Sequence, residues 1–192
     1  MNTTFAVIFL GILVVTNAAS CQKKEPKDNF DSNKYFSAKL EYVQRVSEGP
    51  KQTVCIKFDF KRGSDGKVTS NYDYYGSLQN QNYHNSCNGT QRSNNKGQFS
   101  FKCQQTSDKS SATPNFQEEM TVMETDYNTF SVVSRCVRSG GFSSGSILVL
   151  SKTDAGNGDS SELKKYLEEH SDITFEHERS KANCTVSTIK NK

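Results

Sequence analysis

Cysteine is the residue type whose number and spacing in this chain point most clearly to a chemistry. The sequence contains six, spread over most of its length: Cys21, Cys55, Cys87, Cys103, Cys136 and Cys184. No two of them stand in a C-x-x-C arrangement, so neither a zinc site nor a thioredoxin-type redox site is predicted. An even number of cysteines behind an apolar leader is typical of a secreted protein with three disulfides. The count alone leaves many pairings open.

Histidine, serine and cysteine, which often act in catalysis, do not stand in a catalytic arrangement in this sequence. His84, His170 and His177 are isolated from one another and from the cysteines, and we interpret them as surface residues. The serines lack a convincing His/Asp partner set, and no glycine-rich phosphate loop follows a strand and opens a helix. With all cysteines paired, no thiol remains as a nucleophile. We therefore predict a protein that is not an enzyme and that holds no metal or cofactor.

One carboxylate stands in an unusual pattern. Glu118 alternates in phase with Phe116, Met120 and Val122, which places it on the apolar face of its strand. A carboxylate inside an apolar cup needs a charged partner, and the ammonium group of a biogenic amine could supply one. The other interpretation places Glu118 at the rim of the cup, in water.

An apolar run separates a leader from the rest of the chain. The run Phe5–Thr16 has the length of a signal-peptide core and is too short to span a bilayer, and small residues follow at 18–20. We predict a signal peptide over residues 1–20 and one mature domain over 21–192. The rival interpretation, a bacterial lipoprotein lipidated at Cys21, would leave an odd number of cysteines.

Charge and composition narrow the class of partner. The net charge is +3, with lysines scattered among acidic residues, which argues against nucleic acid. No second apolar segment reaches membrane length. We expect a secreted, extracellular monomer without a nucleic-acid or membrane partner. Sequons at Asn88 and Asn183 are predicted glycosylation sites.

Alternation of apolar and polar residues with period two dominates the mature chain. After the predicted N-cap Asp159 the period changes to that of an amphipathic helix of about three turns. Residues 47–50, 62–66 and 139–145 are predicted as turns or loops. The predicted strands cover residues 36–42, 54–61, 67–76, a polar one within 77–95, 98–104, 115–124, 129–137 and 146–151, followed after the helix by a short strand within 172–179.

Consecutive strands with one apolar face predict an all-β fold, an eight-stranded up-and-down antiparallel barrel with one C-terminal helix and a final short strand. A sandwich is the alternative. An interior of this size holds about one small ligand. The predicted lining of this calyx is apolar and aromatic with hydroxyl tips. It consists of Leu40, Tyr42, Ile56, Phe58, Tyr72, Phe99, Glu118, Met120 and Phe130. For each apolar residue, the alternative is a place in the packed core.

Several short motifs, in order along the chain, resemble one known family. They are Phe30–Phe36, Lys96–Cys103, Thr125–Phe130, Arg135–Cys136, Ser146–Leu150 and Lys181–Cys184. Together with the spacing of the cysteines, they resemble the salivary lipocalins of blood-feeding bugs, the triabin, pallidipin and nitrophorin group. The resemblance covers nearly the whole mature chain and implies a lipocalin barrel. It also implies the disulfides Cys21–Cys136, Cys55–Cys184 and Cys87–Cys103.

The chain departs from the lipocalin pattern at two places. Lipocalins commonly carry Gly-x-Trp on the first strand, where this chain has Ala38 and Leu40, and the chain contains no Trp. Haem-binding members carry a His on the third strand, where the nearest match is Asp73. Haem transport is therefore not expected.

The resemblance implies a protein that impairs host haemostasis, and two mechanisms remain open. In the first, the calyx sequesters a small host mediator, an eicosanoid or a biogenic amine, and so inhibits platelet aggregation. Eicosanoid-binding members carry a basic residue just after the second cysteine, and Ile56 at that position argues against this ligand. In the second, the surface binds a coagulation or contact-system protein such as thrombin, through loops at 46–51, 77–82, 106–114 and 138–145. A homologue without retained activity is a third interpretation.

Overall fold

The computed structural model describes residues 21–184 except 77–80, 94, 110–113 and 156–157, so the predicted signal peptide lies outside the described residues. The strands are β1 (Tyr42–Val46), β2 (Phe58–Arg62), β3 (Lys67–Gly76), β4 (Gln81–Arg92), β5 (Asn95–Ser107), β6 (Asn115–Thr125), β7 (Phe130–Ser139), β8 (Phe142–Ser151) and β9 (His177–Glu178). The helices are α1 (Ser32–Ala38), α2 (Ser161–Glu169) and the 3₁₀ helices η1 (Lys51–Cys55) and η2 (Arg179–Lys181). None of the described helices is long and apolar enough to cross a membrane.

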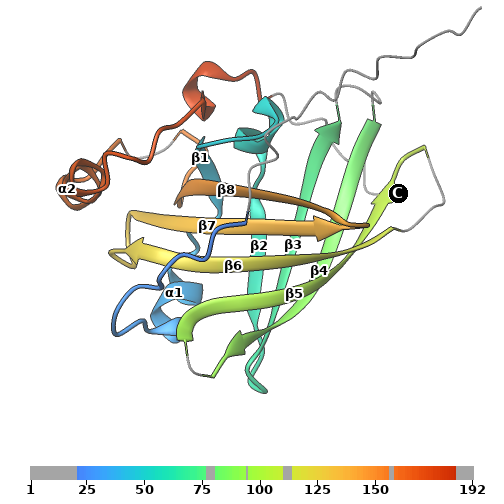
Figure 1. Ribbon diagram of the computed structural model, residues 1–192, viewed down its shortest axis with the longest axis horizontal. Coiled ribbons are helices and arrows are strands. Elements are labelled where there is room, and N and C mark those ends of the chain that lie inside the picture. The colour runs from blue at the N-terminus through green and yellow to red at the C-terminus, as the bar shows by residue number, and fades with distance from the viewer. Residues whose placement is uncertain (1–20, 77–80, 94, 110–113, 156–157, 185–192) are drawn as a thin grey trace, which may run out of the picture.

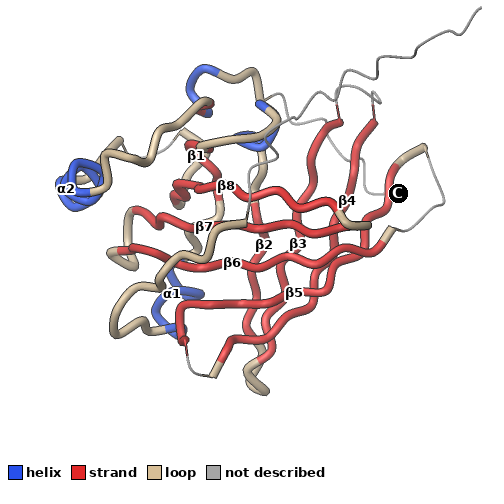
Figure 2. Tube along the Cα trace, in the orientation of Figure 1, coloured by secondary structure: helices blue, strands red, loops and turns tan. Residues whose placement is uncertain are grey.

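The strands form one antiparallel sheet that runs from β2 to β8 in chain order and ends with β1 and β9. The sheet curls so that β6, β7 and β8 cross in front of β2, β3 and β4 (Figure 1), and the helices lie at its periphery (Figure 2). Its ends meet where the Phe58 amide donates to the Glu41 carbonyl at 2.9 Å and the Val43 amide to the Ile56 carbonyl at 3.1 Å. The predicted up-and-down barrel with one later helix and a final short strand is confirmed.

Helix α1 closes one end of the barrel. Asp31 caps it, because its Oδ1 accepts hydrogen bonds from the amides of Asn33 at 2.9 Å and Lys34 at 3.1 Å. Lys39, with a φ of 52°, ends it. The predicted strand over 36–42 is therefore wrong, since its first residues form the last turn of α1 and β1 begins only at Tyr42.

Aromatic side chains fill the interior next to α1. The rings of Phe30 and Phe36 lie 6.1 and 5.4 Å from that of Phe99, centroid to centroid. Phe58 and Phe60 stack at 5.1 Å. This half of the barrel is a packed core, which leaves hollow space for the opposite half.

Two other predicted elements have different bounds in the structure. The predicted strand over 54–61 is wrong in its first half, because η1 follows Pro50 and β2 begins at Phe58. Cys55 thus ends a helical turn and does not face outward from a strand. The predicted strand within 172–179 shrinks to the two residues of β9.

The segment 139–145 is a tight hairpin and not the loop that its Gly and Ser content predicts. Ser139 pairs with Phe142 around Gly140 and Gly141, whose φ angles are 55° and 85°. Positive φ at both central residues is the geometry of a two-residue type I′ turn, which glycine adopts at no steric cost. Strand β8 therefore begins at Phe142.

Helix α2 packs on the outside of the barrel. Its N-cap is Ser160 and not the predicted Asp159, because the Ser160 Oγ accepts a hydrogen bond from the Leu163 amide at 3.2 Å. Asp159 instead pairs with Arg45 at 2.7 Å. Leu163 packs against residues of β7 and β8 in a small second core, separate from the barrel interior.

Three disulfides staple this fold, in the pairs that the family resemblance implies. They join Cys21 to Cys136, Cys55 to Cys184, and Cys87 to Cys103. The last links directly paired residues of β4 and β5, and both of its cysteines are buried in the barrel interior.

Candidate ligand-binding pocket

A pocket of about 470 Å³ opens at the end of the barrel opposite α1. Its volume lies within the range of small-molecule sites. Ile56, Phe116 and Val137 give it apolar walls, whereas Tyr74, Asn85, Gln105 and Arg135 give it polar groups. A wider hollow of about 1,050 Å³ lies along β4 to β8, and its lining mixes polar side chains with Phe116 and Phe142. The interior pocket is the better candidate, because apolar walls around a few polar groups are typical of ligand sites.

Three side chains from three strands form a hydrogen-bonded cluster at the floor of this pocket. Arg135 Nη2 on β7 donates to Glu118 Oε2 on β6 at 2.8 Å and to the Tyr72 hydroxyl on β3 at 2.5 Å. The Tyr72 hydroxyl donates to the same Glu118 oxygen at 2.9 Å. The Glu118 side chain is fully buried, while 12% of the Arg135 side chain is exposed. Arg135 and Tyr72 line the pocket, and Glu118 lies behind them.

Burial and neighbouring charges set the protonation states of the cluster. Desolvation raises the pKa of Tyr72 well above its ordinary value, so the hydroxyl keeps its proton. Burial alone would lower the pKa of the Arg135 guanidinium, but the adjacent Glu118 carboxylate raises it above its usual value. The guanidinium also lies 5.0 Å from the centroid of the Tyr72 ring. The floor therefore holds a cation and an anion side by side, with no net charge.

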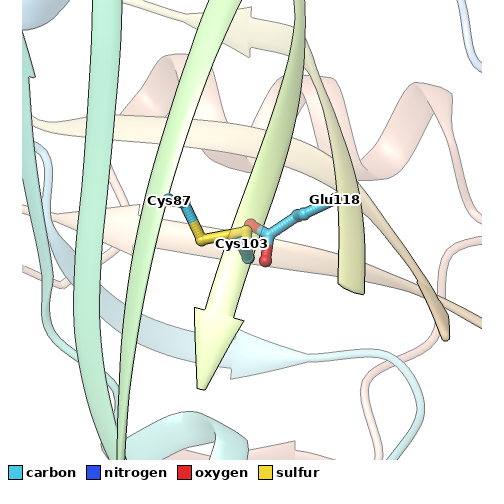
Figure 3. A group of neighbouring side chains, drawn as sticks. All are labelled: Cys87, Cys103 and Glu118. Carbon is cyan, nitrogen blue, oxygen red and sulfur yellow. A yellow bond between two sulfur atoms is a disulfide. The ribbon is translucent and has the colours of Figure 1, made fainter. Parts of the chain in front are cut away.

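The cluster is not fully satisfied by the protein. Among the described residues, neither Glu118 Oε1 nor Arg135 Nε has a hydrogen-bond partner, although both atoms are buried. The Glu118 carboxylate reaches toward the Cys87–Cys103 disulfide (Figure 3). This group has the spacing of a metal site, but its two sulfur atoms are bonded to each other and offer no thiolate.

A second set of polar groups lies on one wall of the pocket. Gln105 Nε2 donates to the Tyr74 hydroxyl at 3.2 Å and to Asn85 Oδ1 at 3.1 Å. Asn85 Nδ2 donates in turn to the Tyr72 carbonyl at 3.4 Å. Desolvation also raises the pKa of Tyr74. This wall offers neutral hydrogen-bonding groups, so among the described residues of the pocket lining Arg135 carries the charge.

The structure places the nine predicted calyx residues in four environments. Ile56 and Tyr72 line the pocket, and Glu118 lies inside the barrel and not at its rim. Leu40, Phe58, Phe99 and Met120 belong to the packed interior core and do not line the pocket.

The remaining two predicted residues lie outside the interior, and their assignment to the lining is wrong. Tyr42 lies beneath the cations of Lys57 and Arg179, at 5.1 and 5.5 Å from its ring centroid, because Val43 takes the inward position at the start of β1. Phe130 belongs to the second core under α2, because the inward residues of β7 begin at Ser131, which bonds to Tyr35.

Arg135 lines the candidate pocket and was not among the residues predicted from the sequence. It lies on β7 in phase with Val133 and Val137, so the alternation that located Glu118 also marks Arg135 as inward. Asn85 was missed because its strand is polar and lacks a clear apolar face. Gln105 was missed because it lies one residue beyond the predicted strand 98–104, although it is in phase with Phe101 and Cys103.

The predicted glycosylation sites are exposed. Asn88 lies on the outer face of β4, and Asn183 lies next to Cys184 after η2. Thr185 of the second sequon is outside the described residues. Glycosylation at either position stays a prediction.

The chain and its fold have counterparts among known proteins. A model of the triabin family matches residues 14–165. The chain belongs to the triabin family. Among triabin-family relatives, pallidipin of Meccus pallidipennis is 31% identical over 96% of this chain and 98% of its own length. Platelet inhibitor triplatin-2 of Triatoma infestans is 29% identical over 81% of this chain and 85% of its own length. The family resemblance seen in the sequence is confirmed.

Solved structures support the lipocalin fold of this triabin-family chain. LTBP1 in complex with leukotriene C4 superposes with a TM-score of 0.55 over 82% of this chain and 92% of the other, at 20% identity. The tryptamine complex of the amine binding protein of Rhodnius prolixus superposes with a TM-score of 0.55 over 79% of this chain and 78% of the other, at 15% identity. At these identities the likeness shows the fold and leaves the ligand open.

Proposed function

We propose that this chain is a secreted salivary protein that sequesters a small host mediator with a carboxylate group, of the eicosanoid class, and thereby inhibits platelet aggregation. One observation carries the choice of ligand. Of the two charges at the pocket floor, the cation of Arg135 lines the pocket, whereas the anion of Glu118 lies behind it. A ligand entering the pocket meets the guanidinium first.

The charge arrangement disfavours a biogenic amine. An ammonium group at the floor would approach Arg135, a like charge in a poorly solvated site, before it reached Glu118. Glu118 is moreover already paired with Arg135 at 2.8 Å. A carboxylate can instead accept hydrogen bonds from Arg135, with good geometry for a planar guanidinium.

Arg135 also answers the difficulty posed by Ile56. Ile56 lies in the pocket lining and is uncharged, at the position where eicosanoid-binding members of the family carry a basic residue. Arg135 brings a cation into the same pocket from β7. An eicosanoid carboxylate therefore has a cationic partner in this pocket, although Ile56 is not basic.

The comparisons support the same proposal. Two relatives are named pallidipin and platelet inhibitor triplatin-2, and one protein of the same fold was solved with leukotriene C4. Another was solved with tryptamine, which keeps the amine class as the competing ligand. The three disulfides fit an oxidising, extracellular compartment. We assign the chain a binding role and not a catalytic one.

Calorimetric titration of the mature protein tests the proposal. We expect heat of binding with a stable thromboxane analogue and a much weaker signal with its methyl ester, which has the same chain and no charge. Serotonin, noradrenaline and histamine are expected to give none. Binding of an amine but not of the acid would overturn the choice of ligand. No heat with any of them, alongside prolonged clotting times, would favour the alternative of a protein-surface inhibitor.

A further inference from the structure

Two aromatic side chains at the mouth of the pocket are unusually exposed. Among the described residues, Tyr75 and Phe142 are the large hydrophobic side chains with the greatest exposure, at 42% and 60%. A single exposed hydrophobic residue needs no explanation. Here, however, both lie in the lining of the same 470 Å³ pocket.

The two side chains come from different parts of the barrel rim. Tyr75 stands near the end of β3, and Phe142 opens β8 directly after the Gly140–Gly141 turn. The backbone of Phe142 is held by its pairing with Ser139 across this turn. The apolar surface of both residues is thus presented to the pocket mouth from a fixed framework.

We propose that the ligand binds with its acidic head at Arg135 and its apolar chain leaving the pocket between Tyr75 and Phe142, which cover that chain and so select ligands by length. This inference rests on the proposed binding of a carboxylate lipid. The floor of the pocket carries the charge and its rim carries exposed apolar surface, so an amphipathic acid matches both ends in one orientation only. A chain too short to reach the rim leaves Tyr75 and Phe142 in water.

The expected effect follows from the area that the chain covers. Burial of apolar surface contributes roughly 25 cal/mol per Å². Removing one ring that covers the ligand should therefore weaken binding of a long-chain acid about tenfold, the equivalent of about 1.4 kcal/mol. Binding of a short-chain acid should not change.

The absence of tryptophan from the chain provides a direct reporter. In Phe142→Trp the single indole stands at the rim. We expect arachidonate to shift its emission to shorter wavelength, and decanoate to bind by calorimetry without shifting it. The matched control is Lys61→Trp, an exposed position on β2 away from the pocket lining, whose emission should respond to neither acid.

Affinities of Phe142→Ala and Tyr75→Ala for the two acids complete the test. A loss of affinity confined to arachidonate supports the inference. If wild type binds neither acid, the proposed function itself fails. If wild type binds both and the variants bind both as tightly, or lose both equally, the carboxylate site stands and the rim inference is overturned. Variants that bind both acids normally but no longer inhibit platelets would assign the two rings to a protein contact and overturn it as well.

Discussion

Glu118 and Arg135 form an ion pair inside the barrel, so each residue lets the other stay charged there. An isolated buried ion costs several kcal/mol, and the 2.8 Å contact between these two groups offsets much of that cost. Alternation in the sequence predicts that Glu118 faces inward. It does not predict the partner, because period-two patterning gives the face of a strand and not which inward side chains meet across it. The pairing of Arg135 with Glu118 is therefore seen only in the structure.

Removing both charges should be tolerated better than removing one. Arg135→Gln leaves the Glu118 carboxylate buried without its cation, and we expect the free energy of unfolding to fall by about 3–5 kcal/mol. Glu118→Gln combined with Arg135→Gln leaves no buried charge and should recover most of that loss. Urea unfolding followed by circular dichroism measures both variants. A double variant as unstable as the single one would show that the pair does not act as a unit.

Tyr35 makes stability depend on pH in the alkaline range. Burial raises its pKa from 10.0 to about 12. A raised folded-state pKa means that the stability is fully present below the unfolded value and is lost as pH rises toward the folded value. Between pH of about 10 and 12 the free energy of unfolding should fall by up to about 3 kcal/mol on account of Tyr35. Denaturant unfolding across this range measures the fall.

Tyr35→Phe provides the control for this prediction. Phe cannot ionise, so the variant should lose less stability than wild type over the same range, while Tyr72 and Tyr74 keep their own dependence. Identical pH profiles of the two proteins would contradict the assignment to Tyr35.

Among the elements, η2 stabilises the junction between β1 and β2, where the two ends of the sheet meet. Strands β1 and β2 meet through a single bridge between Tyr42 and Lys57. Beside it, buried Arg179 from η2 donates to the Val54 carbonyl at 2.5 Å and pairs with Asp154. The Cys55–Cys184 disulfide fastens the same segment to η1.

Arg179→Met should weaken this seam while keeping the side-chain stem. We expect the free energy of unfolding to fall by about 2–4 kcal/mol, because buried carbonyls lose a charged donor. Asp154→Asn is the matched control: Asp154 is 61% exposed, so its pair with Arg179 should contribute less than about 1 kcal/mol. Thermal or chemical unfolding separates the two. Equal losses would mean that the ion pair and not the carbonyl contacts stabilises the seam.

The sequence predicted long strands well and short helices poorly. Strands β3, β6 and β7 lie where alternation puts them, because one of their faces is buried or half-buried along the strand. Helix α1 has only seven residues, and Phe36 and Ala38 fit a strand and a helical turn equally well. Val54 and Ile56 are both buried, as alternation predicts. Val54, however, lies in the 3₁₀ helix η1, and Ile56 is the residue that follows it.

The whole molecule is a barrel with one filled end and one hollow end. Alternation predicted the barrel, and the family resemblance implied its disulfides. The division of the interior could not be predicted, because Phe58, Phe99 and Ile56 show similar patterns and yet only Ile56 lines the pocket. What separates them is the position of α1, whose aromatic neighbours occupy the closed end.

Titration of folded Glu118→Gln with the stable thromboxane analogue, beside wild type, tests the central claim most directly. Glu118 competes with the ligand carboxylate for the Arg135 guanidinium, so its neutralisation should leave the affinity unchanged or make it several-fold tighter. A loss of affinity of tenfold or more, or the loss in this variant of an amine affinity that wild type possesses, would show that Glu118 receives the ligand. That result would contradict the account.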